Sequence, residues 1–380
     1  MEYVRIGEIC SKVCSGGTPT SSNPNYYNGG IPWLNTNEVN FCNIYATNKT
    51  ISQEGLEHSA AKYIPVNTVI VAMYGVTAGK SAIAKIPLTT NQACCNLVID
   101  DNKADYQYVY YFLKQQSDNL NKLANGGAQQ NLNSLIIKKY KIALHSLQIQ
   151  HRIASILSAY DSLIENNTKR IRLLEKMAEN LYKEWFVRFR FPGYEKAEME
   201  NGLPKGWKHG SLSDICEFKR GKNITASEMI AGNVPVISAG IEPSGFHNKA
   251  NVKGVSITMS SSGANAGYIA IHYSDIWAAD CSFINETMTS YICYVYELLN
   301  NIRGVITNFQ RGAAQPHVYP KDINRIKLII PSECLRALAD ERLSVIHKQI
   351  DNLAKQNSLL ARRRDLLLPR LMSGKLEVKP

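Results

Sequence analysis

Two long stretches of the chain carry hydrophobic residues at spacings that alternate between three and four. The first stripe consists of Ile153, Leu157, Tyr160, Ile164, Asn167, Ile171, Leu174, Ala178, Leu181 and Trp185. The second consists of Leu343, Ile346, Ile350, Leu353, Asn357, Leu360, Arg364, Leu367 and Leu371. A stripe sustained over about five heptads is typical of a coiled-coil helix. We therefore predict long helices over 147–191 and 333–373 that pair in antiparallel orientation; the alternative is that each helix only covers its own domain.

Polar residues interrupt both stripes at matching places. Asn167 and Asn357 are expected to fix the register of the pair, because a buried asparagine lowers stability but favours the one alignment that satisfies its amide. Arg364 also falls on the seam, whereas its neighbours Arg362 and Arg363 fall off it. This arginine triple can hold phosphates, face an acidic partner or form an ordinary exposed helix face.

The segments before each stripe are rich in Gly, Asn, Ser and Pro and contain short β-type runs such as "NTVIVAMYGV" and "GVSITMSSS". Such runs between turn residues predict β-rich heads with few helices. We expect an α+β fold with a first head over 1–146, a linker over 192–206 that Pro192-Gly193 opens, a second head over 207–332 and a tail over 374–380.

The two heads repeat each other in sequence. "RIGEIC" at 5–10 matches "SLSDIC" at 211–216, "GGIPWL" at 29–34 matches "GNVPVI" at 232–237, and "KYKIALHSL" at 139–147 matches "RIKLIIPSE" at 325–333. The runs "VIVAMYG" and "VSITMSS" align Met73 with Met259, and "GGAQQ" at 126–130 answers to "RGAAQ" at 311–315. Several matches in one order predict tandem heads of the same topology.

Charge and composition narrow the class of partner. The 380 residues include 43 Lys and Arg against 32 Asp and Glu, a net charge of +11 that favours an anionic partner. No run approaches the ~18 apolar residues of a membrane span. The nine cysteines lack zinc-type spacing, so we expect reduced thiols in a cytoplasmic protein.

The motifs that suggest catalysis are incomplete. "GVTAGKS" at 75–81 has one residue too few between its glycines for a phosphate-binding loop, and "NPNYY" at 23–27 lacks the second proline of an amino-methyltransferase motif. Asp100 and Asp101 have no evident partner, and His151 and His347 are expected at solvated helix positions. We expect no catalytic residue, no metal and no cofactor.

The order of heads and helices resembles a known family. The joints "LIIKKYKIALHSLQIQHRIASILSAYDSLIENN" and "INRIKLIIPSECLRALADERLSVIHKQIDNL", and the head openings "SGGTPTSSNPNYYNGGIPWLNTNEV" and "LPKGWKHGSLSDIC", are similar to the specificity subunit of type I restriction-modification systems. The resemblance implies that each head reads half of a split target in double-stranded DNA. It also implies that the helices space the heads and dock two methyltransferase subunits, with restriction translocase subunits as further partners.

Residues that differ between the heads are the candidates for base contacts. In the first head the candidates are Ser15, Gly16, Gly17, Thr18, Asn35, Thr36, Asn37, Tyr74 and Lys80. In the second they are Lys219, Arg220, Lys222, His247, Ser260, Ser261, Ser262 and Asn265. The shared Gly-Ala-Gln patches add Gln129, Gln130, Arg311, Gln315 and His317. These patches are either structural turns or contacts to phosphate or adenine.

We therefore expect a non-catalytic DNA-specificity subunit that recognises a bipartite asymmetric target and recruits separate methyltransferase and restriction subunits. Two alternatives stay open at this point: a self-sufficient DNA adenine methyltransferase, and a coiled-coil scaffold whose heads bind protein or RNA.

Overall fold

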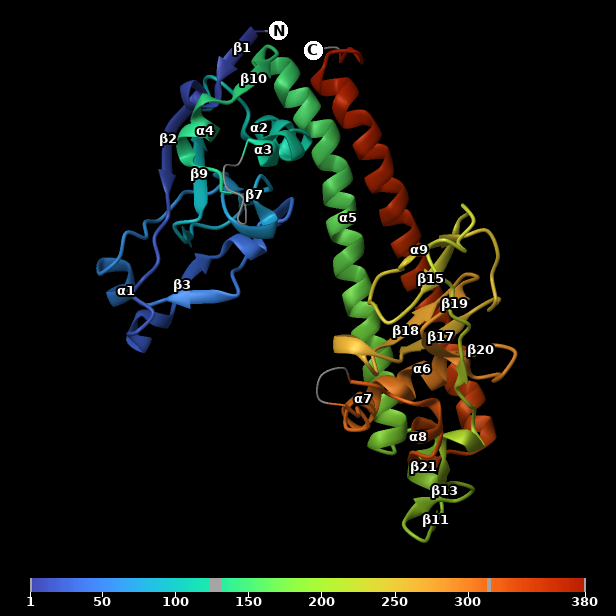
Figure 1. The fold of residues 1–380 in the computed structure, drawn as a ribbon. Coiled ribbons are helices and arrows are strands. Elements are labelled where there is room, and N and C mark those ends of the chain that lie inside the picture. Colours follow the sequence, from blue (N-terminus) through green and yellow to red (C-terminus); the bar gives the residue numbers. More distant parts are fainter. Residues whose placement is uncertain (1, 124–130, 313–315, 379–380) are drawn as a thin grey trace. The chain divides into compact units, whose positions relative to one another are not determined.

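The structure, a computed structural model, describes residues 2–123, 131–312 and 316–378. The chain divides into two compact units: unit 1 comprises Met1–Glu165 and Asn357–Pro380, and unit 2 comprises Asn166–Gln356. Each unit contains one head and a segment of both long helices (Figure 1). Each head therefore shares its compact unit with part of the long helix that follows it and with part of the long helix that follows the other head.

The head of unit 1 is built on two sheets. The larger has the strand order β2 (Cys10–Ser15), β9 (Cys94–Ile99), β6 (Val69–Ala72), β7 (Ser81–Ala84) and β4 (Cys42–Ile44). The smaller has the order β5 (Lys49–Ile51), β3 (Tyr27–Leu34) and β8 (Thr89–Thr90). A separate pair joins β1 (Glu2–Arg5) to β10 (Lys141–Leu144). The helices are α1 (Gln53–Glu57), α2 (Tyr106–Gln115), α3 (Ser117–Lys122) and α4 (Ser134–Lys139).

The central strands of this head are buried on both faces. Alternate residues of β6 enter two different clusters: Val69 and Val71 pack with α2, whereas Ile70 and Ala72 pack with Leu34 on the other side. Successive side chains of a strand point to opposite faces, so a continuous apolar run such as "VIVA" needs cover on both. The apolar run in the sequence thus reflects a sheet enclosed between two layers.

Unit 2 repeats this plan. Its larger sheet has the order β14 (Lys219–Arg220), β20 (Cys281–Asn285), β17 (Ser256–Ser260) and β18 (Ile269–His272). Its smaller sheet has the order β16 (Gly245–His247), β15 (Val234–Ile237) and β19 (Trp277–Ala278), and β13 (Lys208–Ser211) pairs with β21 (Lys327–Ile330). The helices are α6 (Ile292–Asn301), α7 (Arg303–Thr307) and α8 (Pro320–Asn324), and a hairpin of β11 (Met199–Glu200) and β12 (Leu203–Pro204) precedes the head. The expected tandem α+β heads are confirmed.

The long helices are α5 (Leu147–Tyr182) and α9 (Glu333–Met372), drawn in green and red in Figure 1. In unit 1, Asp161 of α5 is ion-paired with Arg364 near the end of α9. In unit 2, Arg342 near the start of α9 lies over the ring of Trp185, which follows α5, at 5.2 Å. An early part of one helix thus meets a late part of the other in each unit, which is antiparallel packing. The positions of both predicted stripes are buried or half-buried throughout.

The first helix ends before the predicted 191. Regular α-helix stops at Tyr182, a π-helical turn follows over Lys183–Val187, and Phe189 then adopts a left-handed φ of 57°. Trp185 and Phe186 on this turn are both buried. The helix therefore ends where aromatic side chains pack into the head of unit 2, and not at the proline that marks the end in sequence.

The prediction of a solvated position for His347 is wrong. His347 is buried, with Nε2 at 3.0 Å from the Glu297 carboxylate and Nδ1 at 2.7 Å from the Tyr273 hydroxyl. Helical spacing could not reveal this, because α6 and not α9 supplies the covering carboxylate. His151 is exposed as expected, although it lies 3.0 Å from Asp105.

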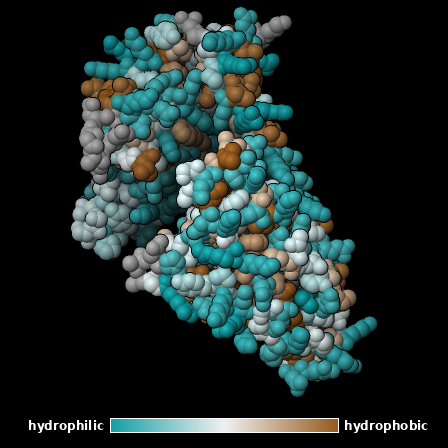
Figure 2. All heavy atoms as spheres, turned by 45° about the vertical axis from the view of Figure 1, so that its right-hand side comes forward, coloured by the Kyte–Doolittle hydropathy of each residue, from teal (hydrophilic) through white to brown (hydrophobic). Residues whose placement is uncertain are grey.

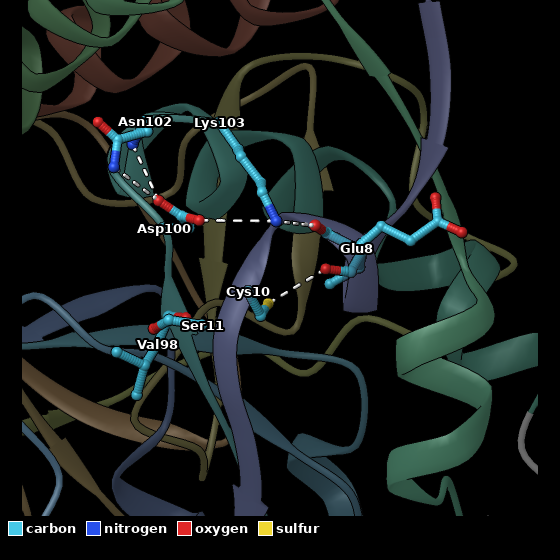
Figure 3. Close-up of polar contacts among 8 residues, drawn as sticks. Glu8, Cys10, Ser11, Val98, Asp100, Asn102 and Lys103 are labelled. Carbon is cyan, nitrogen blue, oxygen red and sulfur yellow. Dashed lines mark hydrogen bonds and ion pairs between the residues drawn. The ribbon is translucent and has the colours of Figure 1, made fainter.

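Asp100, for which the sequence shows no evident partner, closes the end of the β2–β9 pair that lies away from the Ser15 end of β2 (Figure 3). It accepts hydrogen bonds from the backbone N–H and the amide of Asn102 at 3.1 and 3.3 Å, and Lys103 Nζ lies 3.6 Å away. Lys103 Nζ also donates to the Glu8 carbonyl at 3.1 Å. The acidic pair therefore belongs to a structural turn.

None of the helices in the described part of the chain has the length and apolarity that a membrane crossing requires. Figure 2 shows mostly hydrophilic residues on the visible face, with hydrophobic residues scattered singly or in small groups.

Candidate nucleic-acid interface

The first group of candidates lies at the end of equivalent strands in the two heads. Ser15 ends β2 and faces β9, and Arg220 ends β14 and faces β20. Two residues after these strand ends, the backbone N–H of Gly17 donates to the carbonyl of the last residue of β8. The backbone N–H of Lys222 donates in the same way to the last residue of β19, and both distances are 2.9 Å. The same backbone scaffold thus presents different side chains in each head.

The second group lies on the β6–β7 and β17–β18 turns, which share one backbone conformation. Each turn contains a glycine at positive φ, Gly75 (77°) or Gly263 (75°). Each is closed by a 2.9 Å hydrogen bond from a second glycine, Gly79 or Gly267, to the last residue of the preceding strand. Glycine adopts positive φ without steric cost, which explains its presence here. The segment "GVTAGKS" is therefore a hairpin turn.

These turns correct the alignment of Met73. Its structural counterpart is Ser261 and not Met259: the Met73 carbonyl accepts the Leu132 N–H at 2.9 Å, and the Ser261 carbonyl accepts the Val318 N–H at 3.0 Å. The error is a shift of two residues. Such a shift leaves every side chain on the same face of a strand, so the hydrophobic pattern could not reveal it.

In the first head the candidates differ in how far they reach solvent. Tyr74 is 41% exposed at the turn, and Asn37 is exposed. Lys80 Nζ donates to Asn40 Oδ1 at 2.9 Å. Asn35 donates its backbone N–H to the Glu38 carboxylate and begins a short helical turn, Thr36–Glu38, so its backbone has a structural role.

The β2 loop of the first head is partly buried. Ser15 and Thr18 are exposed, and the Thr18 hydroxyl is hydrogen-bonded to Gln92, whereas Gly16 is half-buried and Gly17 is buried. The Gly17 carbonyl accepts the indole N–H of Trp33 at 2.9 Å. The indole N–H of Trp277 reaches the equivalent Lys222 carbonyl of the second head at 2.8 Å.

In the second head, several cationic candidates are exposed, whereas the serines are not. Lys219, Arg220 and Lys222 are exposed on the β14 loop, and Asn265 is half-buried on the hairpin turn. The remaining candidates Ser260, Ser261, Ser262 and His247 are buried. Ser262 donates its hydroxyl to Asp280 Oδ2 at 2.6 Å, so its role in this conformation is internal.

The flanks of the Gly-Ala-Gln patches adjoin the hairpin turns. Gln129, Gln130 and Gln315 lie outside the described residues. Arg311 and His317 pair through two backbone hydrogen bonds of 2.9 and 2.8 Å, and His317 also bridges to Ser262. The Arg311 guanidinium lies 2.9 Å from Asp322 and is mostly exposed. Arg311 and His317 thus lie beside the turn that carries the other candidates.

The seam asparagines differ in environment. Asn167 is buried, and its amide lies 3.5 Å from the Gln356 side-chain oxygen. Asn357 is half-buried. A polar contact at a buried seam position supplies the directional constraint that a register-setting residue needs.

Asp280 is a residue of this interface that the sequence did not single out. It precedes β20 and joins two candidates, because Oδ1 accepts from Arg220 Nη2 at 2.5 Å while Oδ2 accepts from Ser262. Its counterpart before β9 in the first head is Ala93. The only signal in the sequence is this exchange of alanine for a carboxylate between the repeats.

Metal ligands and cysteine thiols are the remaining candidates for chemistry among the described residues. Among them no group of three or more His, Cys, Asp or Glu side chains is placed to hold a metal ion. All nine cysteines are free thiols, and burial raises the pKa of Cys95 and of Cys281 to about 12. Such thiols stay protonated and unreactive near neutral pH.

Comparisons with known proteins agree with this architecture. A family model described as "Type I restriction modification DNA specificity domain" matches residues 1–176 and 204–359. The type I restriction enzyme MjaIX specificity subunit of Methanocaldococcus jannaschii is 29% identical over 98% of this chain and 92% of its own length. A putative type I specificity subunit of Mycoplasma genitalium is 26% identical over 83% of this chain and 84% of its own. The crystal structure of a type I S subunit from M. genitalium matches the fold with a TM-score of 0.65 at 21% identity, over 97% of this chain and 95% of that one.

Repeated heads on paired long helices, together with these matches, define a DNA-specificity protein. The chain belongs to the type I restriction modification DNA specificity family. The predicted specificity role is thus confirmed, and neither the self-sufficient methyltransferase nor the scaffold is supported.

Proposed function

We propose that the two heads read the two halves of a bipartite, asymmetric target in double-stranded DNA, and that the chain is non-catalytic. In this proposal it acts in the cytoplasm and brings two methyltransferase subunits, and restriction translocase subunits, to that target. The observation that carries the proposal is that equivalent loops of equivalent heads present different side chains.

Equivalent positions of both loops carry different side chains. On the strand-end loop Ser15 stands opposite Arg220, and on the hairpin turn Lys80 stands opposite Tyr268. Side chains that approach base edges determine sequence preference, whereas a shared backbone does not. Two heads with different side chains at these places are expected to select different half-sites.

Exposed apolar side chains on the long helices support the recruitment of partners. Leu163, Leu173 and Met177 of α5, and Leu359 and Leu366 of α9, lie off the predicted stripes and are each more than half exposed. An apolar residue off the stripe does not contribute to helix pairing. These faces are therefore available for helices of a methyltransferase subunit.

The experiment is methylation sequencing of DNA from cells that carry this chain with its methyltransferase. We expect a split adenine-methylated motif that disappears when the chain is removed. Exchange of residues 1–146 for the first head of a relative should change one half of the motif, and exchange of 207–332 should change only the other. A change in both halves after a single exchange would refute the assignment of one half-site to each head.

A second set of cells tests the absence of catalysis. Cells that carry this chain without a methyltransferase are expected to show no methylated motif. Methylation under that condition would make the chain an enzyme and overturn the proposal.

A further inference from the structure

We propose that Arg220, positioned by Asp280, reads a guanine in the half-site of the second head. This inference rests on the proposed function. Arg220 is the residue that contacts the guanine, and Asp280 is a positioning residue that acts through Arg220.

The Arg220 side chain is exposed to a ligand and is also hydrogen-bonded to Asp280. Its side chain is 47% exposed at the end of β14, and Nη2 donates to Asp280 Oδ1 at 2.5 Å. A guanidinium has five N–H donors, so four remain free to meet a ligand. Arginine uses two such donors at once when it binds the O6 and N7 acceptors of guanine in the major groove.

Asp280 is fixed from its other side. Its second oxygen accepts the hydroxyl of Ser262 at 2.6 Å, and Ser262 is only 6% exposed. Ser262 belongs to the β17–β18 turn, which the His317 bridge also contacts. The position of the Arg220 head group is therefore set by three segments of the head: β14, the start of β20 and the hairpin turn.

This arrangement favours a base over a phosphate as the ligand. The Asp280 carboxylate offsets much of the positive charge of Arg220, which weakens its attraction to an anionic phosphate. It does not remove the directional N–H donors that a neutral guanine edge requires. Because Asp280 also orients the long arginine side chain before binding, less side-chain entropy is lost when the contact forms.

The pair is of little use for stability alone. An ion pair between side chains this exposed contributes little to the free energy of unfolding. The first head folds with the same strands and the same turn although Ser15 and Ala93 occupy the two positions. The scaffold therefore does not need the pair, and any effect on recognition should be confined to the second half-site.

The test uses the complex of the full chain with its methyltransferase on a DNA library with a randomised target. The variants are Arg220→Ala, Arg220→Lys and Asp280→Asn, with Lys208→Ala as the control that removes an exposed charge outside the candidate loops. Arg220→Ala should lower discrimination for guanine at one position of the second half-site by about 5- to 150-fold. Arg220→Lys should lose most of it as well, because lysine keeps the charge but not the planar fork.

Asp280→Asn should lower discrimination at that same position by a smaller factor, about 3- to 10-fold, and leave the first half-site unchanged. A merely structural role for Asp280 would instead reduce methylation of every sequence alike. The Lys208→Ala control should retain the wild-type motif.

The outcomes separate this inference from the proposed function. If wild type yields no split motif, the proposed function fails. If wild type yields a split motif but the Arg220 variants leave every position unchanged, or weaken all sequences equally, the guanine contact is wrong and Arg220 is neutral or binds phosphate. Should Arg220→Ala fail to fold, Arg220→Lys decides the question by the same criterion.

Discussion

The ion pair between Asp161 and Arg364 gives a quantitative test of helix pairing in unit 1. Arg364 occupies a seam position, its side chain is 12% exposed, and that of Asp161 is 22% exposed. Tyr111 donates its hydroxyl to the same carboxylate at 2.6 Å. Burial opposes the charge of Arg364, but the carboxylates of Asp161 and Asp365 together outweigh it and hold the pKa of Arg364 above its usual value. The guanidinium of Arg364 is therefore charged at neutral pH.

The cost of breaking this pair follows from its burial. Removing one partner of a fully buried pair costs about 3–5 kcal/mol. Because part of Asp161 still reaches water, we expect Arg364→Leu to cost about 2–3 kcal/mol. The double variant Asp161→Asn/Arg364→Leu removes both partly buried charges, leaves only the exposed Asp365 without its arginine and keeps an acceptor for Tyr111, so it should cost about 1 kcal/mol. The single variant Asp161→Asn should also cost about 1 kcal/mol, because Arg364 keeps its ion pair with Asp365. The coupling energy of the cycle is then about 2–3 kcal/mol.

The assay is urea unfolding of the full chain, with hydrogen exchange of peptides from α2 and from the end of α9 to report on unit 1. Arg362→Leu is the matched control, since this arginine is exposed on the same helix, and it should change stability by no more than about 0.5 kcal/mol. A double variant as unstable as Arg364→Leu, or a coupling energy below about 0.5 kcal/mol, would show that the pair does not hold the seam.

Burial lowers the pKa of His272 to about 4. As pH falls, the unfolded state therefore binds a proton at this histidine before the folded state does. Unit 2 should lose about 2 kcal/mol of its free energy of unfolding from pH 7.5 to 5. His272→Gln should abolish that slope in urea titrations, and an unchanged slope would assign it elsewhere. A Cβ at Gly16 would lie 2.0 Å from a backbone oxygen of β8, so Gly16→Ala should cost about 2 kcal/mol or more in thermal unfolding. Gly304 lies in α7, and a Cβ there would meet no neighbouring atom, so Gly304→Ala should stabilise the fold by up to about 1 kcal/mol. Equal effects of Gly16→Ala and Gly304→Ala would contradict the predicted clash at Gly16. Leucine at both Asn167 and Asn357 should raise thermal stability by about 1 kcal/mol while loosening register, and a clear loss would argue against their seam position.

Local periodicity and repeats in the sequence predict the long helices and the tandem heads. The heptad stripes located both long helices, because the 3.6-residue period of a helix places every third or fourth side chain on one face. Ordered repeats such as "RIGEIC" and "SLSDIC" predicted two heads of one topology. The candidate loops also follow from the sequence, since they are the segments that differ between otherwise matching copies.

Features that depend on contacts between distant residues are visible only in the folded chain. Asp280 joins the candidate interface because β14 and β20 are neighbours, although Arg220 and Asp280 are 60 residues apart. The counterpart of Met73 could be identified only from the hydrogen bonds of the turns, because a two-residue shift in the alignment leaves the same side chains on the same face of the strand. The prediction of a solvated His347 is wrong because helical spacing shows which face a residue occupies but not which element covers that face. Periodicity is a property of the chain alone, whereas burial and ion pairing require a partner that only the folded arrangement of strands and helices brings within reach.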